Sequence, residues 1–133
     1  MPLSDAARAF IAEKVLVHVA TLMRDGSPQV TPVWVEADGD DILINVTEES
    51  LETRNMRRDG RVAASIIGFA YPWRRIQVRG RIKEITTEGA IEQIDRLSAK
   101  YNGEGTYGGH QQGHTRVTVR IEPLRVRERV NLG

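Results

Sequence analysis

The sequence contains no cysteine, which excludes disulfide bonds, thiolate catalysis and metal sites with cysteine ligands. Aromatic residues are scarce, with two Phe, two Trp and three Tyr among 133 residues, so little is available to stack on nucleic-acid bases. No apolar run approaches the roughly 18 residues of a membrane span, and the first residues lack the pattern of a signal peptide. We therefore expect a cytoplasmic protein without a membrane or nucleic-acid partner.

Lysine is also scarce, because only three of the 19 basic residues are lysine and the others are arginine. The formal net charge is +1, which does not indicate a general attraction to polyanions. Arginine is suited to planar, bidentate contacts with carboxylates and phosphates, although a GC-rich codon bias explains the excess equally well. With 40% hydrophobic and 28% charged residues, the composition predicts one soluble globular domain over residues 1–133.

Hydrophobic periodicity predicts a mainly β chain with short helices: a six-stranded antiparallel barrel capped by helices at its ends. We expect strands at 15–22, 29–36, 42–46, 62–67, 76–85 and from 117 onward, and helices at 5–14, 47–59 and from 87 to about 101. Gly60 is expected to cap the second helix. The first strand is apolar on both faces, so we interpret His18 as a core residue whose polar atoms are satisfied.

No catalytic or metal-binding constellation is apparent. Residues 103–108 fit G-x-G-x-x-G but follow a helix and precede a strand, the reverse of the order that dinucleotide binding requires. His110 and His114 lie in the same glycine-rich loop without neighbouring acids, so a mobile loop explains them better than zinc. We therefore predict no catalytic residue and no metal ligand from the motifs.

Two arginine clusters have alternative interpretations. They consist of Arg57, Arg58 and Arg61, and of Arg74 and Arg75. Each is either the solvated end of a helix or strand, or a clamp for phosphate or carboxylate groups.

Five segments together resemble a known family. They are residues 20–35 (ATLMRDGSPQVTPVWV), 54–63 (RNMRRDGRVA), 71–81 (YPWRRIQVRGR), 94–103 (with IDRL and KY) and 120–123 (RIEP). In this order they are similar to the pyridoxamine 5'-phosphate oxidase-like, FMN-binding split-barrel proteins. More narrowly, they resemble the group that uses the deazaflavin coenzyme F420. The resemblance extends over about residues 4–128.

The resemblance implies a homodimeric split barrel that holds two cofactors in grooves between the subunits. It implies an oxidoreductase that transfers a hydride between coenzyme F420, or alternatively FMN, and a small electron-poor organic substrate. Because the coenzyme carries the hydride chemistry, the protein needs to supply orientation and shelter rather than an acid or a nucleophile. This agrees with the lack of a catalytic constellation.

The resemblance also implies which residues bind the cofactor. The ring is expected on two strands, the phosphate at the start of the second helix, and a third segment closes the site from the same chain or the partner. The residues expected at the ring are Val30, Thr31, Pro32, Val33, Asn45, Val46 and Thr47. Those expected at the phosphate are Ser50, Arg54 and Asn55. The closing segment consists of Tyr71, Pro72, Trp73 and Arg74.

One departure from the family concerns the phosphate. Family members commonly carry an arginine and a lysine where this chain has Ser50 and Glu52, and Glu48 and Glu49 lie beside them. A like-charge pair at about 4 Å costs on the order of 1 kcal/mol even in water. Either other arginines (Arg54, Arg57, Arg74 or Arg75) bind the phosphate, or the chain is a non-catalytic protein that binds a cofactor, haem or hydrophobic metabolite.

Overall fold

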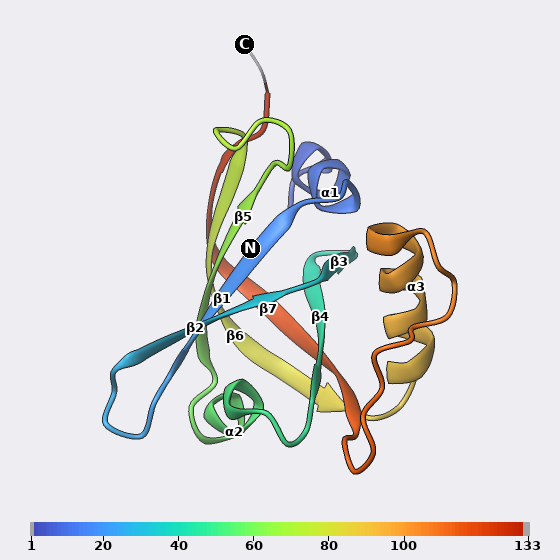
Figure 1. Cartoon of the computed structure of the whole chain (residues 1–133). Coiled ribbons are helices and arrows are strands. Elements are labelled where there is room, and N and C mark those ends of the chain that lie inside the picture. Colours follow the sequence, from blue (N-terminus) through green and yellow to red (C-terminus); the bar gives the residue numbers. More distant parts are fainter. Residues whose placement is uncertain (1, 132–133) are drawn as a thin grey trace.

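The computed structural model describes residues 2–131, so the ends of the predicted 1–133 domain lie outside the described residues. In chain order the elements are α1 (Asp5–Ala12), β1 (Leu16–Leu22), β2 (Pro28–Val33), β3 (Val35–Asp38), β4 (Asp41–Thr47), α2 (Leu51–Arg58), β5 (Arg61–Ile67), β6 (Arg75–Thr86), α3 (Ala90–Asn102) and β7 (Arg116–Arg129). The strands form one antiparallel sheet in the order β2-β1-β5-β6-β7-β4-β3 (Figure 1). The predicted mainly β, antiparallel architecture with three short helices is confirmed.

The predicted number of six strands is wrong, because the segment expected at 29–36 forms two strands. β2 pairs with β1 and β3 pairs with β4, so the two strands lie at opposite ends of the sheet although only Trp34 separates them. The sheet must therefore curl until its ends meet, as the path of β2 and β3 across the molecule shows (Figure 1). The apolar pattern runs on through Trp34, so nothing in it marks the break.

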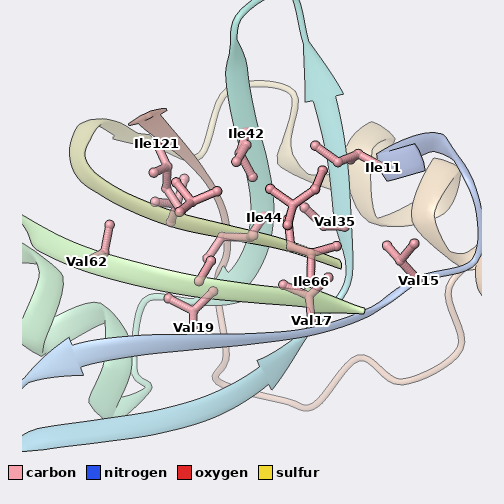
Figure 2. Packing of buried hydrophobic residues seen from close by; sticks show 14 of the residues in the cluster. Ile11, Val15, Val17, Val19, Val35, Ile42, Ile44, Val62, Ile66 and Ile121 are labelled. Atoms are coloured by element: carbon pink, nitrogen blue, oxygen red, sulfur yellow. The ribbon is translucent and has the colours of Figure 1, made fainter. Parts of the chain in front are cut away.

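The concave side of the curled sheet holds the main hydrophobic core (Figure 2). Ile42 and Ile44 of β4 meet Val17 and Val19 of β1 there, together with Ile66 of β5. Burying side chains of this size contributes roughly 1.5–3 kcal/mol each. The core is thus built from strands that are distant in the sequence, and it fixes the curvature of the sheet.

Only one face of β1 is buried, which corrects the interpretation of residues 15–22. Val17, Val19 and Thr21 point into the core, whereas Leu16 and His18 are exposed on the outer face. His18 is therefore not a core histidine. A strand covered on one side normally alternates apolar and polar residues, and this strand is apolar on both, so its outer face is open to a further contact.

The long β6–β7 pair bends at a register shift between Arg79 and Gly80. A Cβ atom on Gly80 would lie 2.5 Å from the backbone oxygen of Glu122, so no other residue fits without moving the neighbouring strand. Such bulges increase the local twist of a sheet. Gly80 thereby allows the two longest strands to follow the curvature of the barrel.

The second helix is shorter than the predicted range of 47–59. Thr47 still belongs to β4, and Ser50 is the N-cap, its hydroxyl oxygen accepting a hydrogen bond from the backbone N–H of Thr53. At the other end Asp59 is the C-cap in an extended conformation, so the expected capping role of Gly60 is wrong. The acids before Leu51 therefore occupy a turn, not helical positions.

Helix α3 lies against β4 and β7 and is anchored at its C-terminal end. The Tyr101 hydroxyl donates to the backbone oxygen of Val15 over 2.9 Å. The Lys100 ammonium donates to the backbone oxygens of Ile11 and Val35 over 2.6 and 2.7 Å. These bonds tie α3 to the end of α1, to the residue before β1 and to the start of β3. None of the helices within residues 2–131 is long and apolar enough to cross a membrane.

Lys100 makes the stability of this anchor depend on pH. Burial lowers the pKa of Lys100 from 10.5 to about 8. Burial also raises the pKa of Tyr101 to about 12, so in the folded state Tyr101 keeps its proton across this range. Folding therefore releases a proton from Lys100 between these pKa values of 8 and 10.5, and its contribution to the unfolding free energy rises with pH across that interval.

We predict that the unfolding free energy of the wild type, measured relative to Lys100→Met, increases between pH 7 and pH 10. Urea denaturation of both proteins at each pH measures this difference, and titrations shared by the two proteins cancel. A difference that stays constant or falls with pH would contradict the assignment.

Candidate functional site

A groove of about 650 Å³ opens where the two ends of the sheet meet, and we call it the seam groove. Its walls come from β1, β2, β4, α2, α3, the 103–115 loop and β7. The lining residues are Val15, Leu16, Val17, His18, Pro32, Val33, Trp34, Asn45, Val46, Thr47, Glu52, Ile94, Tyr101, Tyr107 and Arg116. Cavities of this size and apolar character are typical of small-molecule sites.

One wall of the seam groove is aromatic. Trp34 stacks on Tyr101, with ring centroids 5.2 Å apart and planes 4° from parallel. Tyr107 meets Trp34 edge-on at 5.9 Å, and its backbone N–H is held by the Asp95 carboxylate at 2.8 Å. The glycine-rich loop is thus held to α3 at Tyr107, and the three rings together line one side of the groove.

Two groups of opposite formal charge line the seam groove, Glu52 and Arg116. The Arg116 guanidinium donates to the Asn45 side-chain oxygen at 3.3 Å and to the Tyr107 hydroxyl at 3.1 Å, and it lies 4.8 Å from the Tyr107 ring centre. Within residues 2–131 neither Arg116 nor Glu52 forms an ion pair. Both charges are therefore free to act on a ligand.

The structure brings together five of the residues expected to contact the ring: Pro32, Val33, Asn45, Val46 and Thr47. The Asn45 amide nitrogen donates to the backbone oxygen of Ala90 and to the Gln93 side-chain oxygen over 2.8 and 2.9 Å, so its carbonyl oxygen faces Arg116. Val30 and Thr31 do not line this groove. Val30 lies on the outer face, 56% exposed.

The expected phosphate site at the start of α2 is occupied by the chain's own contacts. The Ser50 hydroxyl caps the helix and donates to the backbone oxygen of Thr47 at 2.9 Å. Glu48 forms a two-point ion pair with Arg57, whose hydrogen bonds hold the pKa of that carboxyl below its usual value. The Glu49 carboxylate accepts from the backbone N–H of Thr115 at 2.7 Å.

Arg54 and Asn55 lie on the other side of α2, in a second hollow. The Arg54 guanidinium is exposed and donates to the backbone oxygen of Glu49. Asn55 is fully buried, and its amide nitrogen donates to the Thr21 hydroxyl at 3.1 Å. Asn55 therefore fastens α2 to β1 and does not face the seam groove.

The segment 71–74 lies at the α1 end of the sheet, away from α2 (Figure 1). Arg74 pairs with both carboxylate oxygens of Glu13 at 3.0 Å and donates to the backbone oxygen of Val130 at 2.7 Å. Its guanidinium also lies over the Phe10 ring. Tyr71 and Trp73 are exposed, so within one chain none of this segment reaches the seam groove.

The residues that sequence reasoning missed are Trp34, Tyr101, Tyr107 and Arg116. Tyr101 resembled an ordinary core position of a helix, and Tyr107 lies in a loop without periodicity. The one available signal was the scarcity of aromatic residues, because three of the few present meet in one wall. Within the described part of the chain no cluster of His, Asp and Glu side chains is arranged to hold a metal ion.

The groove suits the ring of a flavin-like cofactor better than its phosphate. Apolar strand residues beside an aromatic wall suit a planar ring. The usual phosphate position does not suit an anion, because the Ser50 hydroxyl is used as a helix cap and the acids Glu48, Glu49 and Glu52 surround it. An anionic tail would have to be held elsewhere in the groove.

Comparison with known proteins gives a consistent family. The family model described as pyridoxamine 5'-phosphate oxidase matches residues 3–129. No curated protein sequence matches the chain.

Three solved structures illustrate the structural likeness. An F420 reductase is 22% identical with a TM-score of 0.80, covering 96% of this chain and 100% of that one. A conserved hypothetical protein from Mycobacterium tuberculosis is 25% identical with a TM-score of 0.71, covering 94% and 83%. HupZ of Group A Streptococcus is 19% identical with a TM-score of 0.68, covering 98% and 99%. At such identities the likeness shows a shared fold.

Proposed function

The chain belongs to the pyridoxamine 5'-phosphate oxidase family, and we propose that it transfers a hydride between a coenzyme bound in the seam groove and a small electron-poor organic substrate. The family binds FMN and related flavins. We propose the deazaflavin coenzyme F420 as the coenzyme, with FMN as the alternative. The F420 reductase of the same fold supports this choice.

The observation that carries the proposal is the shape and chemistry of the seam groove. Pro32 and Val33 on one strand and Val46 on another offer an apolar surface, and Trp34 and Tyr107 bound it. The groove contains one permanently charged base and one acid, and they do not form a pair. Such a site can bind and orient a planar molecule, but it supplies no nucleophile with an activating base.

When bound, the coenzyme supplies a ring position that gives or accepts a hydride. The chain's own contribution is to position the ring and to keep water from its reacting face. Val33 and Val46 provide apolar contact area, and Tyr107 holds the glycine-rich loop beside the groove. The chain would raise the rate by orienting the coenzyme ring and by surrounding it with apolar side chains, without a protein acid or base.

A second function is supported by Glu52. Its unpaired carboxylate in the groove and the use of Ser50 as a helix cap disfavour a phosphorylated cofactor at α2. The same groove in a non-catalytic protein would hold a neutral planar metabolite or haem without turnover. Failure to bind either coenzyme would favour this second function before any substrate is known.

Titration of the purified protein with oxidised F420 and with FMN, at low and at physiological salt, tests the proposal. We predict micromolar or tighter binding of F420, which is measured by the quenching of coenzyme fluorescence. Binding of FMN alone would assign the flavin alternative. If neither coenzyme binds at low salt, the oxidoreductase assignment is wrong and the non-catalytic function replaces it.

We also propose that two copies of the chain associate through the outer face of the sheet. This face carries exposed Leu16 and Val30. A groove of about 620 Å³ on it is lined by Val30 together with Ala20 and Ala63, which are opposite each other on β1 and β5. Exposed apolar area of this kind marks interaction surfaces. The exposed Tyr71 and Trp73 of one copy are then available to the other.

Size-exclusion chromatography with light scattering tests the dimer. We predict a dimeric wild type and a monomeric Ala63→Arg variant, because the large cation replaces a small residue in the middle of the interface. Ala99→Arg makes the same change on the exposed side of α3 and should remain dimeric. A monomeric wild type, or a dimeric Ala63→Arg, would contradict this interface.

A further inference from the structure

We propose that Arg116 binds the phosphate oxyanion of the ligand in the seam groove, in place of a clamp at the start of α2. The inference rests on the proposed function, because it names the residue that recognises the coenzyme's phosphate. It assigns a binding role to a residue of β7 that the family resemblance did not indicate.

Arg116 is located next to the strand end from which α2 begins. It is paired with Thr47 across β4 and β7, and the backbone N–H of Glu48 donates to the backbone oxygen of Thr115 at 2.8 Å. The loop that leads into β7 and the turn before α2 accordingly lie together at the same end of the molecule (Figure 1). A phosphate that approaches this end of the groove meets Arg116.

The guanidinium of Arg116 is held in place before any ligand arrives. Its two terminal nitrogens donate to Asn45 and Tyr107, and its plane lies near the Tyr107 ring. A guanidinium carries five N–H donors, and these two contacts leave donors for an oxyanion. Because the half-buried side chain is already oriented, less conformational entropy is lost on binding than for a freely moving arginine.

The other arginines considered for this role are engaged elsewhere. Arg57 is paired with Glu48. Arg74 is paired with Glu13 at the far end of the sheet, where Arg75 donates to the backbone oxygen of Trp73. Arg54 is exposed on the opposite side of α2. Arg116 is the one arginine that lines the seam groove, and within residues 2–131 no carboxylate pairs with it.

Glu52 limits how much negative charge the groove accepts. Its carboxylate lines the same groove and has no cation of its own in the described chain. A phosphate monoester carries about −1.5 to −2 charges at neutral pH. We therefore expect Arg116 to bind a singly charged phosphodiester, such as that of F420, more readily than a monoester.

The experiment compares FMN with riboflavin, which differ only by the phosphate, in the wild type and in Arg116→Gln. We predict that the substitution weakens FMN binding about tenfold or more, as expected for loss of a hydrogen bond to a charged group. Riboflavin binding should stay within about twofold, since it reports the ring site alone. Arg116→Lys keeps the charge without the planar donors and should be intermediate. Arg24→Gln removes an exposed arginine outside the groove and should change neither ligand.

The outcomes separate the two claims. If the wild type binds the ring ligands but Arg116→Gln leaves the ratio of FMN to riboflavin affinity unchanged, the Arg116 assignment is overturned and the proposed function stands. It is also overturned if Arg54→Gln lowers that ratio while Arg116→Gln does not, because the phosphate then lies beyond α2. If Arg116→Gln weakens riboflavin as much as FMN, the residue has only a structural role. If no ring ligand or F420 binds the wild type, both the inference and the proposed function are wrong.

A change at Glu52 provides an independent measurement. Glu52→Lys should tighten FMN binding without affecting riboflavin, because it removes the repulsion and adds a cation near the phosphate. Combined with Arg116→Gln, it should restore part of the lost FMN affinity. No change in FMN affinity at low salt would show that the phosphate does not enter this end of the groove, which overturns the assignment.

Discussion

The closure of the sheet at Trp34 is the constraint on which the rest of the structure depends. One residue joins β2 to β3, and these strands form opposite ends of the same sheet. The sheet therefore has to curl around its core, and the groove lies where the ends meet. Trp34 itself becomes part of the groove wall and stacks on Tyr101, whose hydroxyl anchors α3. The connection that closes the sheet thus also builds the candidate site.

Around this closure several charged side chains hold loops and helices in place. Arg57 and Glu48 fix the turn before α2, and Arg74 and Glu13 fix the opposite end of the sheet. The Arg57–Glu48 pair is exposed and contributes little stability, whereas Arg74 is half-buried beside an exposed Glu13. Both pairs remove the arginines concerned from any role in the groove. Within residues 2–131 Arg116 and Glu52 form no ion pair, and they are the two formally charged side chains that line the groove.

Much of the fold could be predicted because it depends on local patterns. Alternation along residues 76–85 and the Asp-Gly turns indicated antiparallel strands, and Ser4 marked the start of α1, where its hydroxyl oxygen accepts from the Ala7 N–H. The break at Trp34 was missed because pairing partners, not local periodicity, decide where β2 ends. His18 was misplaced because an apolar strand does not reveal that one of its faces is uncovered.

The candidate site was predicted only in part, because its parts come from distant segments. The resemblance indicated Pro32–Val33 and Asn45–Thr47, which do line the groove. Of its phosphate residues, however, Ser50 caps α2, Asn55 anchors α2 to β1, and Arg54 is exposed outside the groove. Arg116 could not be found from the sequence, since its environment depends on Asn45 and Tyr107.

The most direct test of the proposed site is a crystal structure with F420 or FMN bound. We predict the ring between Pro32–Val33 and Asn45–Thr47, with a phosphate oxygen within hydrogen-bonding distance of Arg116. A ring bound outside the seam groove would contradict the account.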